Sequence, residues 1–415
     1  MIRRSVRTIA AAIALALGAV GLSACESDGN YSGKTTLVLM NSQWMDALRG
    51  DKLWAVMEKY EKVNPKVVLE KSEVPSKDIQ TKLPTELGAK LGPDVMMLQE
   101  PLFWVVRDAL LPLDEATAEA NNLNATNDGA QVEGRQLGVS WQRAAYGLVF
   151  NRKLLNEAGV EPPETVDELI TAAHEVQSET GAIGFTSRHQ MNEFDNWYKD
   201  FMNWTAGYGG QWATQGQLTI DSPHNIAAVE AFKKLYDADV IPYGDDFPTQ
   251  RNRFKSGDVG FSIDNSGGTL NMATGSKVSS DVGASRLPFP SPGSHQQIYL
   301  ALNKNMDGEK QRAALDFVQW LLTDDAQQAL RSASGPDLLA TDVPLDPKFA
   351  KKNPWAQNFY EAAADSSGTV IEGYELETAQ IMRPVMDAVE RVLTKNADPR
   401  KELEKAQEEA TGLVG

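Results

Sequence analysis

Residues 35–40, TTLVLM, form a short run of β-branched and apolar residues that predicts a buried strand. Two more strands are predicted at residues 67–70 and 94–98. Between these strands, apolar residues recur at helical spacing and predict helices around residues 53–60 and 76–87. Strands that alternate with helices indicate parallel βαβ units, in which helices cover both faces of the sheet. This part of the chain therefore predicts an α/β fold.

The same alternation continues along the rest of the chain. Further strands are predicted at residues 147–151, 183–186, 259–263 and 298–301. Further helices are predicted at residues 165–179, 223–239, 308–322 and 324–334, and the tail from residue 354 onward is predicted to be helical. The α/β pattern is thus not confined to one region of the sequence.

The first residues have the pattern of an export signal. Arg3, Arg4 and Arg7 supply positive charge, and residues 9–20 are almost purely apolar. This run is shorter than the ~20 apolar residues that a membrane-spanning helix needs, so we expect the segment to be cleaved. Cys25 is the only cysteine of the chain, so it cannot form an internal disulfide.

The residues LSAC at 22–25 resemble the lipobox of bacterial lipoproteins. The resemblance implies a signal peptide at residues 1–24, cleavage before Cys25, and a diacylglycerol group on its sulfur. Several acyl chains hold a protein on a membrane far more firmly than one chain does. Residues 25–34 would then be a lipidated, polar, flexible tether that anchors the protein to the outside of the cell membrane. The alternative is an ordinary secretion signal with an incidental cysteine.

Length and composition indicate a globular protein with two lobes. Roughly 390 residues remain after the signal, which is more than one hydrophobic core usually organises. Hydrophobic residues make up 42% and charged residues 23% of the 415 residues, which are ordinary globular values. The net charge of -17 and the pI of about 4.8 argue against nucleic acid as a partner. We expect a monomer.

The ends of the predicted strands carry the candidate site residues, because ligands of open α/β sheets bind beyond the carboxyl ends of strands. These residues are Ser42, Gln43 and Trp44 after residues 35–40, Glu100 and Trp104 after residues 94–98, Trp141 and Arg143 after the run RQLGVS, and Asn265 and Gly267 after residues 259–263. Each group combines amide, hydroxyl or charged side chains with aromatic or glycine residues. We expect a ligand site where these groups meet.

Several longer segments resemble a known family. They are GPDVMMLQE, YGLVFNRKLLNEAGVEPPETVDEL, FKSGDVGFSI and EKQRAALDFVQWLLTDDAQQAL, in this order. Together with the lipobox, they resemble the extracellular solute-binding proteins of family 1, the sugar-binding lipoproteins of bacterial ABC importers. The resemblance implies an α/β, two-lobed, periplasmic-binding-protein-like fold, in which each lobe is a mainly parallel sheet flanked by helices. It also implies a ligand cleft between the lobes, which closes on binding.

The resemblance also suggests lobe boundaries and contact residues. We expect lobe 1 at residues 35–143 and 298–340, and lobe 2 at residues 144–297 and 341–415, with the chain crossing near Arg143-Ala144, Gln297 and Ala340-Thr341. The family contacts map to Ser42, Gln43, Trp44, Glu100, Trp141, Arg143 and the segment that contains Asp195 and Trp197. Many relatives carry a tryptophan after the strand that ends near Ile263, whereas this chain has DNSGGT.

Nine tryptophans fit a carbohydrate ligand, because the C–H face of a sugar ring packs on a flat aromatic surface while its hydroxyls need polar partners. Trp44, Trp104, Trp141 and Trp197 are expected at loop positions in the site, and Trp141 is the main candidate for a stacking platform. The alternative is core packing, which we expect for Trp54, Trp320, Trp204, Trp212 and Trp355. For Arg143 and Glu100 the alternative is a surface ion pair, worth at most about 1 kcal/mol.

Motifs of nucleophilic or metal-dependent enzymes are missing from the sequence. No G-x-S-x-G or H-E-x-x-H motif occurs, and the four histidines are not at metal-site spacing, so no cofactor or metal is expected. We therefore predict a non-enzymatic, lipid-anchored protein that captures a carbohydrate, an oligosaccharide in particular, by hinge closure and delivers it to the permease subunits of an ABC importer. The alternative is a surface-anchored glycoside hydrolase, since two carboxylates and aromatic residues also suit sugar cleavage. A polyamine- or iron-binding relative would need an acidic cage or clustered tyrosines instead.

Overall fold

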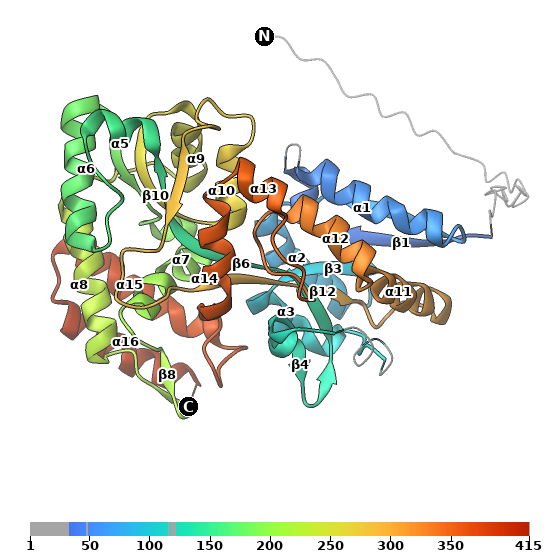
Figure 1. The fold of residues 1–415 in the computed structure, drawn as a ribbon. Coiled ribbons are helices and arrows are strands. Elements are labelled where there is room, and N and C mark those ends of the chain that lie inside the picture. The colour runs from blue at the N-terminus through green and yellow to red at the C-terminus, as the bar shows by residue number, and fades with distance from the viewer. Residues whose placement is uncertain (1–32, 47–48, 115–116, 118–121, 415) are drawn as a thin grey trace, which may run out of the picture. The chain divides into compact units, whose positions relative to one another are not determined.

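The computed structural model describes residues 33–46, 49–114, 117 and 122–414, and residues 35–415 form one compact unit. Its main strands lie in the order β2-β1-β3-β12-β6-β10-β7, and β11 pairs with β6 (Figure 1). The strands are β1 (Thr35–Met40), β2 (Val67–Ser72), β3 (Val95–Gln99), β6 (Gly138–Asn151), β7 (Ile183–Thr186), β10 (Val259–Asn265), β11 (Val282–Ser285) and β12 (His295–Leu302). Two small hairpins are formed by β4 (Gln131–Val132) with β5 (Arg135–Gln136), and by β8 (Ala213–Thr214) with β9 (Gln217–Leu218).

The long strand β6 belongs to two sheets and so joins two lobes. Its first part, residues 138–145, pairs with β12, whereas from Tyr146 onward it pairs with β10 and then also with β11. Lobe 1 is the part built on strands β2, β1, β3 and β12 together with the start of β6. Lobe 2 is the part built on the end of β6 together with β7, β10 and β11. The ladder between β6 and β12 shifts register between Ile298 and Tyr299, which marks a β-bulge or similar irregularity.

Both sheets are mixed, which corrects the expectation of mainly parallel sheets. The pairs β1/β2, β1/β3 and β7/β10 are parallel. The pairs that involve β6 or β12 are antiparallel. The physical reason is the connection between the lobes, since β6 and β12 run in opposite directions through the junction and add antiparallel neighbours to each parallel core.

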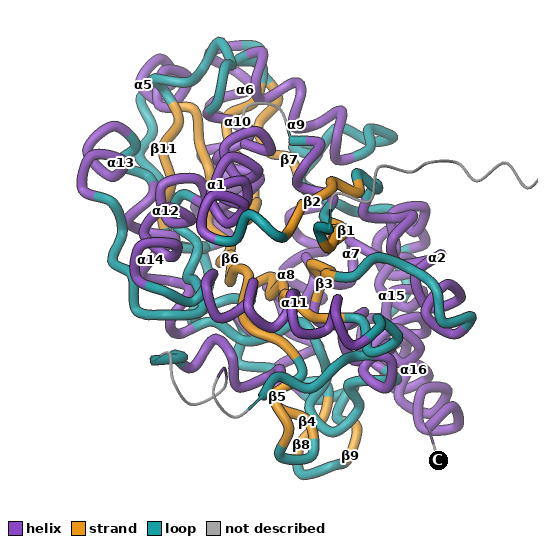
Figure 2. The backbone as a smooth tube through the Cα atoms, turned by 90° about the vertical axis from the view of Figure 1, so that its right-hand side faces the viewer, coloured by secondary structure: helices purple, strands orange, loops and turns teal. Residues whose placement is uncertain are grey.

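Helices surround the strands in both lobes (Figure 2). Lobe 1 carries α1 (Arg49–Val63), α2 (Ser76–Gly88), α3 (Glu100–Val106), α11 (Gly308–Leu321) and α12 (Asp324–Ser334). Lobe 2 carries α5 (Arg152–Ala158), α6 (Val166–Thr180), α7 (Phe194–Gly207), α8 (Pro223–Asp237), α9 (Phe247–Ser256), α10 (Ser266–Ala273), α13 (Pro347–Lys352), α14 (Ala356–Asp365), α15 (Thr378–Lys395) and α16 (Pro399–Val414). Short 3-10 helices include η1 (Ser42–Met45) and η3 (Ala125–Ala130). None of the helices in the described ranges is long and apolar enough to cross a membrane.

Local sequence signals explain where several helices begin and end. Thr165 and Glu168 form a capping box at the start of α6, in which each side chain accepts from the backbone N–H of the other residue. The same helix ends at Gly181, whose positive φ of 70° favours glycine. These caps fix α6 within a residue of the range that the sequence predicts.

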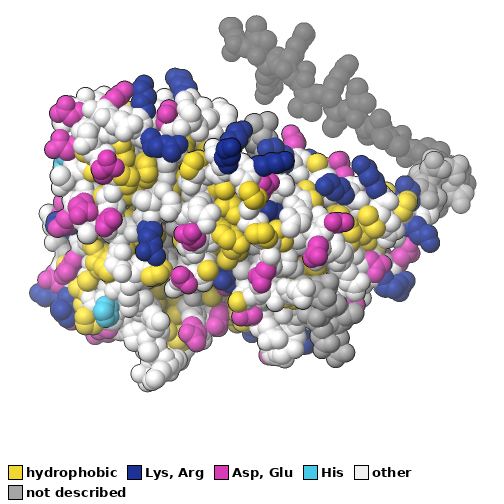
Figure 3. All heavy atoms as spheres, viewed as in Figure 1, with side chains coloured by type: hydrophobic (Ala, Val, Ile, Leu, Met, Phe, Trp, Pro, Cys, Tyr) yellow, Lys and Arg dark blue, Asp and Glu magenta, His cyan; other side chains and the backbone are white. Residues whose placement is uncertain are grey.

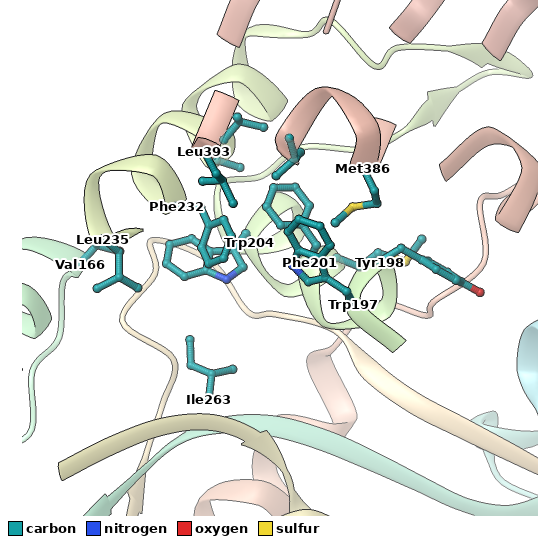
Figure 4. Close-up of a cluster of buried hydrophobic side chains, with 14 of the residues drawn as sticks. Val166, Trp197, Tyr198, Phe201, Trp204, Phe232, Leu235, Ile263, Met386 and Leu393 are labelled. Atoms are coloured by element: carbon teal, nitrogen blue, oxygen red, sulfur yellow. The ribbon is translucent and has the colours of Figure 1, made fainter. Parts of the chain in front are cut away.

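Each lobe has a hydrophobic core on both faces of its sheet. In β3, Val95 and Met97 belong to one buried cluster, whereas Met96 and Leu98 belong to another, as expected from the alternation of side chains along a strand. The largest cluster in lobe 2 packs α7 against α8 and α15, with Trp197, Phe201, Trp204 and Phe232 at its centre (Figure 4).

Several local predictions need correction. Ser140 to Arg143 do not end a strand but lie inside β6, because this segment finds a partner in β12 where the sequence suggested a break. Trp104 lies on α3 and Trp197 on α7, so neither occupies a loop. The tail is helical only in part, since residues 366–377 between α14 and α15 are irregular.

Charged side chains are spread over the surface. On the face shown in Figure 3, Lys and Arg side chains are interspersed with Asp and Glu side chains. The described residues on that face therefore offer no continuous basic patch, which agrees with the acidic composition.

Candidate functional site

Polar groups of the two lobes meet where β3 and β10 end. Lys199 on α7 donates to Oε1 of Gln99, the last residue of β3, at 2.8 Å. Ser266 at the start of α10 donates its hydroxyl to Asp337, which follows α12. We call this group of residues the interlobe cluster: Arg49, Gln99, Glu100, Lys199, Ser266, Gly267, Asp337 and Thr369. Among the described residues, this cluster joins residues of both lobes by direct polar contacts.

Arg49 links three parts of this cluster. Its guanidinium donates to Oε1 of Gln142 at 3.1 Å and to Asp337 at 3.3 Å. A Cβ added at Gly267 would lie 3.1 Å from Nη1 of Arg49, so the glycine allows the close approach of this side chain. Burial raises the pKa of Asp337, while the positive charge of Arg49 opposes that shift. An arginine of lobe 1 is thus held against the N-terminal turn of a lobe 2 helix.

Glu100 is buried at the start of α3 and is held by groups from other segments. It accepts from the backbone N–H of Thr369 at 3.2 Å and from the hydroxyl of Tyr299 at 3.5 Å. Burial is the main cause that raises its pKa, although these donors and Arg143 act against it. Arg143 instead donates its Nε to Gln297 at 3.0 Å. The two side chains are therefore not the surface ion pair that the sequence left as an alternative.

Trp141 lies in the core of lobe 1, which corrects the prediction of an open stacking platform. Only 1% of Trp141 is exposed. Its indole N–H donates to Oε1 of Gln43 at 2.9 Å, and Nε2 of Gln43 donates to Gln142 at 2.9 Å. The ring of Trp44 meets it edge-on at 6.0 Å, and the indole N–H of Trp44 donates to the carbonyl of Leu39. Both indoles are buried next to the end of β1, and neither ring has an exposed face on which a sugar could stack.

The other predicted site residues occupy different environments. Trp197 is buried in the lobe 2 core, and Asp195 is exposed on the same helix. Trp104 is partly buried, with the guanidinium of Arg107 over its ring at 5.7 Å. Asn265 caps α10 by accepting from the N–H of Gly268, and Ser42 is half-buried in η1. Of these, only Asn265 lies next to the interlobe cluster in sequence.

Sequence reasoning missed several residues that the structure brings together, namely Arg49, Gln99, Lys199, Asp337 and Thr369. Gln99 directly follows the strand predicted at residues 94–98, so the strand-end rule was sufficient to find it. The others lie inside or just after helices, or in the irregular segment before α15. Because their partners are far away in sequence, no local pattern marks them.

The described cavities do not coincide with the interlobe cluster. A cavity of about 780 Å³ lies in lobe 2 and is lined by residues such as Tyr146, Pro163, Phe289 and Asp365. A smaller cavity of about 230 Å³ lies beside the C-terminal end of α7 and includes Trp212. The candidate site therefore rests on the polar contacts between the lobes. Within the described ranges, no three His, Cys, Asp or Glu side chains are grouped so that they could hold a metal ion.

The fold and these contacts define a two-lobed α/β protein with the polar interlobe cluster between its lobes. The sequence matches the family of bacterial extracellular solute-binding proteins over residues 46–328. Because this match covers more than half of the chain, the chain belongs to that family, whose members are binding proteins. The two-lobed fold inferred from the sequence is confirmed.

Individual relatives resemble the chain over nearly its full length. The diacetylchitobiose binding protein DasA of Streptomyces coelicolor is 26% identical over 390 residues, which are 88% of this chain and 87% of DasA. The structure of maltose-bound MalE3 from Thermotoga maritima superposes with a TM-score of 0.78 at 21% identity, over 91% of this chain and 99% of the other. UgpB from Mycobacterium tuberculosis, solved with glycerophosphocholine, gives a TM-score of 0.78 at 16% identity, over 92% and 98%. These structural matches show the shared fold.

Proposed function

We propose that this protein captures a carbohydrate outside the cytoplasm and delivers it to the permease subunits of an ABC importer. The full-length similarity to the diacetylchitobiose binding protein carries this proposal. The interlobe cluster supports it, because its amides, carboxylates and cations are the partners that sugar hydroxyls need. A ligand held by both lobes would shift the equilibrium toward the closed arrangement. The size of this shift is set by how much more tightly the ligand binds the closed arrangement than the open one.

We propose that the hinge lies where three segments meet at Arg143. Its backbone pairs with Leu338 through two hydrogen bonds, and its register partner in β12 is Gln297. This agrees with lobe 1 at residues 35–143 and 298–340 and with lobe 2 at residues 144–297 and 341–415. Each lobe would then be built from two separate stretches of the chain.

For the ligand contacts, we propose the non-aromatic members of the predicted set: Ser42, Gln43, Glu100, Arg143, Asp195, Asn265 and Gly267. Trp44, Trp141 and Trp197 would not touch the ligand but would support the residues that do, since their rings are covered by other side chains. Trp104 on α3 is the least covered of the four, although the guanidinium of Arg107 lies over its ring at 5.7 Å. The absence of a tryptophan after β10 agrees with a site that relies on polar contacts at α10.

A thermal-shift screen tests the proposed ligand class. N,N′-diacetylchitobiose, maltose and glycerophosphocholine would be compared, each at millimolar concentration. A sugar present at 100 times its dissociation constant should stabilise the native state by about 2.7 kcal/mol. A shift with glycerophosphocholine and with neither sugar would contradict the carbohydrate proposal.

The glycoside hydrolase alternative has a separate test. Incubation of the protein with chitin- and maltose-derived oligosaccharides should leave them intact, because a binding protein makes no covalent change. Shorter sugars in the product mixture, at a rate proportional to protein concentration, would contradict a function in binding alone.

We further propose that a lipid on Cys25 anchors the mature protein to the cell membrane. The predicted signal peptide, residues 1–24, and Cys25 lie outside the described residues. The proposal rests on the LSAC motif and on membership in an extracellular family. Such a protein would be held as a monomer near its permease by the tether at residues 25–34.

Replacing Cys25 by serine should release the protein from the membrane without loss of sugar binding. The change removes the sulfur that would carry the diacylglycerol, while the described fold begins several residues later. Detergent-phase partitioning of cell fractions measures the anchoring. Substitution of Ser27 by alanine is the control, and mutant Cys25→Ser protein that stays in the detergent phase would contradict lipidation.

A further inference from the structure

We propose that Lys199 determines the class of sugar that binds: its ammonium group donates to a sugar oxygen and selects hydroxylated or N-acetylated sugars over sugars with a free amine. This inference rests on the proposed function, since it names the sugars that the interlobe cluster accepts. Lys199 was not among the residues expected from the sequence.

The position of Lys199 places a cation at the boundary of the two lobes. The residue lies on α7 of lobe 2 and is 2% exposed. Its Nζ donates to Oε1 of Gln99 in lobe 1 at 2.8 Å, and Nε2 of Gln80 on α2 donates to the same oxygen at 3.1 Å. Because Gln80 already satisfies this oxygen, a ligand oxygen can take over the bond from Lys199 without leaving Gln99 unpaired.

The charge of Lys199 has no directly bonded carboxylate. Among the described residues, no carboxylate oxygen lies within the 4.0 Å ion-pair distance of its nitrogen. Asp200 is engaged by Arg188 and by the hydroxyl of Tyr146, and Asp195 is exposed on the preceding turn. An ammonium group has three donors, and the contact with Gln99 uses one of them. The ring of Tyr198 lies 5.4 Å from the same nitrogen, but it supplies no hydrogen-bond acceptor of the oxygen type. A buried cation without a directly bonded carboxylate suits an oxygen acceptor from a ligand, since buried charges are normally paired.

The electrostatics of this region agree with that geometry. Burial lowers the pKa of Lys199 to about 8, and Arg188 acts in the same direction, while Asp195 and Asp200 oppose the shift. Its hydrogen-bond partner in lobe 1 is the neutral amide of Gln99, to which the neutral amide of Gln80 is bonded in turn. An oxygen of the ligand would favour the charged form, whereas a ligand cation would disfavour it.

The chemistry of the two kinds of sugar then decides between them. A hydroxyl or an acetamido carbonyl oxygen accepts a hydrogen bond from the ammonium, whereas a protonated amine has no lone pair to offer and repels it. A hydrogen bond to a charged group contributes about 1.5–3 kcal/mol, which corresponds to roughly tenfold to hundredfold in affinity. We therefore expect a preference of at least about tenfold for the acetylated member of a matched pair.

Calorimetric titration with matched sugars tests this inference. The probes are N,N′-diacetylchitobiose against chitobiose, and N-acetylglucosamine against glucosamine, at pH 6, with maltose as an amine-free reference. The wild-type protein should prefer the acetylated sugars. Lys199→Met should lose about tenfold in affinity for them and should bind both members of a pair more equally. Lys153→Met, which removes an exposed lysine of α5, is the matched control and should change neither affinity nor preference.

A pH profile separates a direct contact from a structural role. Wild-type affinity for the acetylated sugar should fall as the pH rises from 7 to about 9.5, because the ammonium of pKa about 8 loses its proton. The profile of Lys199→Met should be flat, and its melting temperature should match or exceed that of the wild type, since a buried unpaired charge has been removed.

The possible failures are distinguishable. Sugar binding by the wild type with unchanged affinity, preference and pH profile in Lys199→Met would overturn the inference and leave the proposed function intact. If the wild type binds none of the five sugars, the carbohydrate function itself is overturned, and the role of Lys199 with it.

Discussion

Replacing Trp141 by alanine should lower the free energy of unfolding by about 3–5 kcal/mol, the range found when large buried aromatic residues are truncated. The indole projects from β6 into the core of lobe 1 and is buried, and the ring of Trp44 packs against it edge-on. The substitution also leaves Oε1 of Gln43 without its indole donor. Denaturant unfolding followed by circular dichroism measures the loss.

The matched control is Trp104→Ala, since Trp104 is a tryptophan of the same lobe that is only partly buried. Its truncation should cost clearly less, because less apolar surface is returned to water and a smaller cavity is left. The opposite outcome for Trp141, unchanged stability with a roughly thirtyfold loss of sugar affinity, is the behaviour of an aromatic binding hot spot. It would return Trp141 to the ligand site.

Replacing Arg251 by methionine should also destabilise the fold by about 3–5 kcal/mol, because it leaves the buried charge of Asp264 uncompensated. Nε and Nη2 of Arg251 each donate to one carboxylate oxygen of Asp264 at 2.6 Å. The side chain of Asp264 is 1% exposed. Methionine keeps much of the packing of the arginine stem but supplies no donor.

Arg253→Met provides the control on the same helix. Arg253 makes a similar pair with Asp245, with an Nε to oxygen distance of 2.6 Å, but its side chain is 46% exposed. Exposed pairs of this kind contribute about 0–1 kcal/mol, so the two variants should differ by several fold in stability loss. Equal losses in chemical denaturation would show that burial does not decide the strength of these pairs.

Local elements of the fold could be predicted where the signals are local. The predicted strand at residues 183–186 and the predicted helix at residues 324–334 coincide with β7 and α12. The hydrophobic alternation of β1 and the caps of α6 depend only on neighbouring residues, so the sequence contains them in full. The short helices α9 and α10 and the strand β11 were not predicted, because their apolar patterns are too brief to stand out.

The long strand β6 shows what sequence patterns cannot supply. Ser140, Gln142 and Arg143 are polar, and from sequence they indicate a loop. In the structure each is paired within the junction, for example Arg143 with Gln297 and with the backbone of Leu338. The polar character of this stretch reflects its place between two lobes, which is a property of the tertiary structure.

The candidate site was predictable in part for the same reason. Strand ends pointed to Glu100, Asn265 and Gly267, which lie in or beside the interlobe cluster. Arg49, Lys199 and Asp337 were missed because only the crossing of the chain brings them to this cluster. The burial of Trp141 and Trp197 was not decidable either, because an aromatic residue suits a core and a sugar site equally well.

The continuity of β6 and β12 through the junction has a mechanical consequence. Two paired strands resist stretching and shearing, whereas they yield to bending and twisting, so relative movement of the lobes must be a rotation spread over many backbone torsions. The register shift between Ile298 and Tyr299 interrupts the regular ladder between these two strands. The lobes are thus joined by paired backbone, so they cannot move apart unless these strands bend.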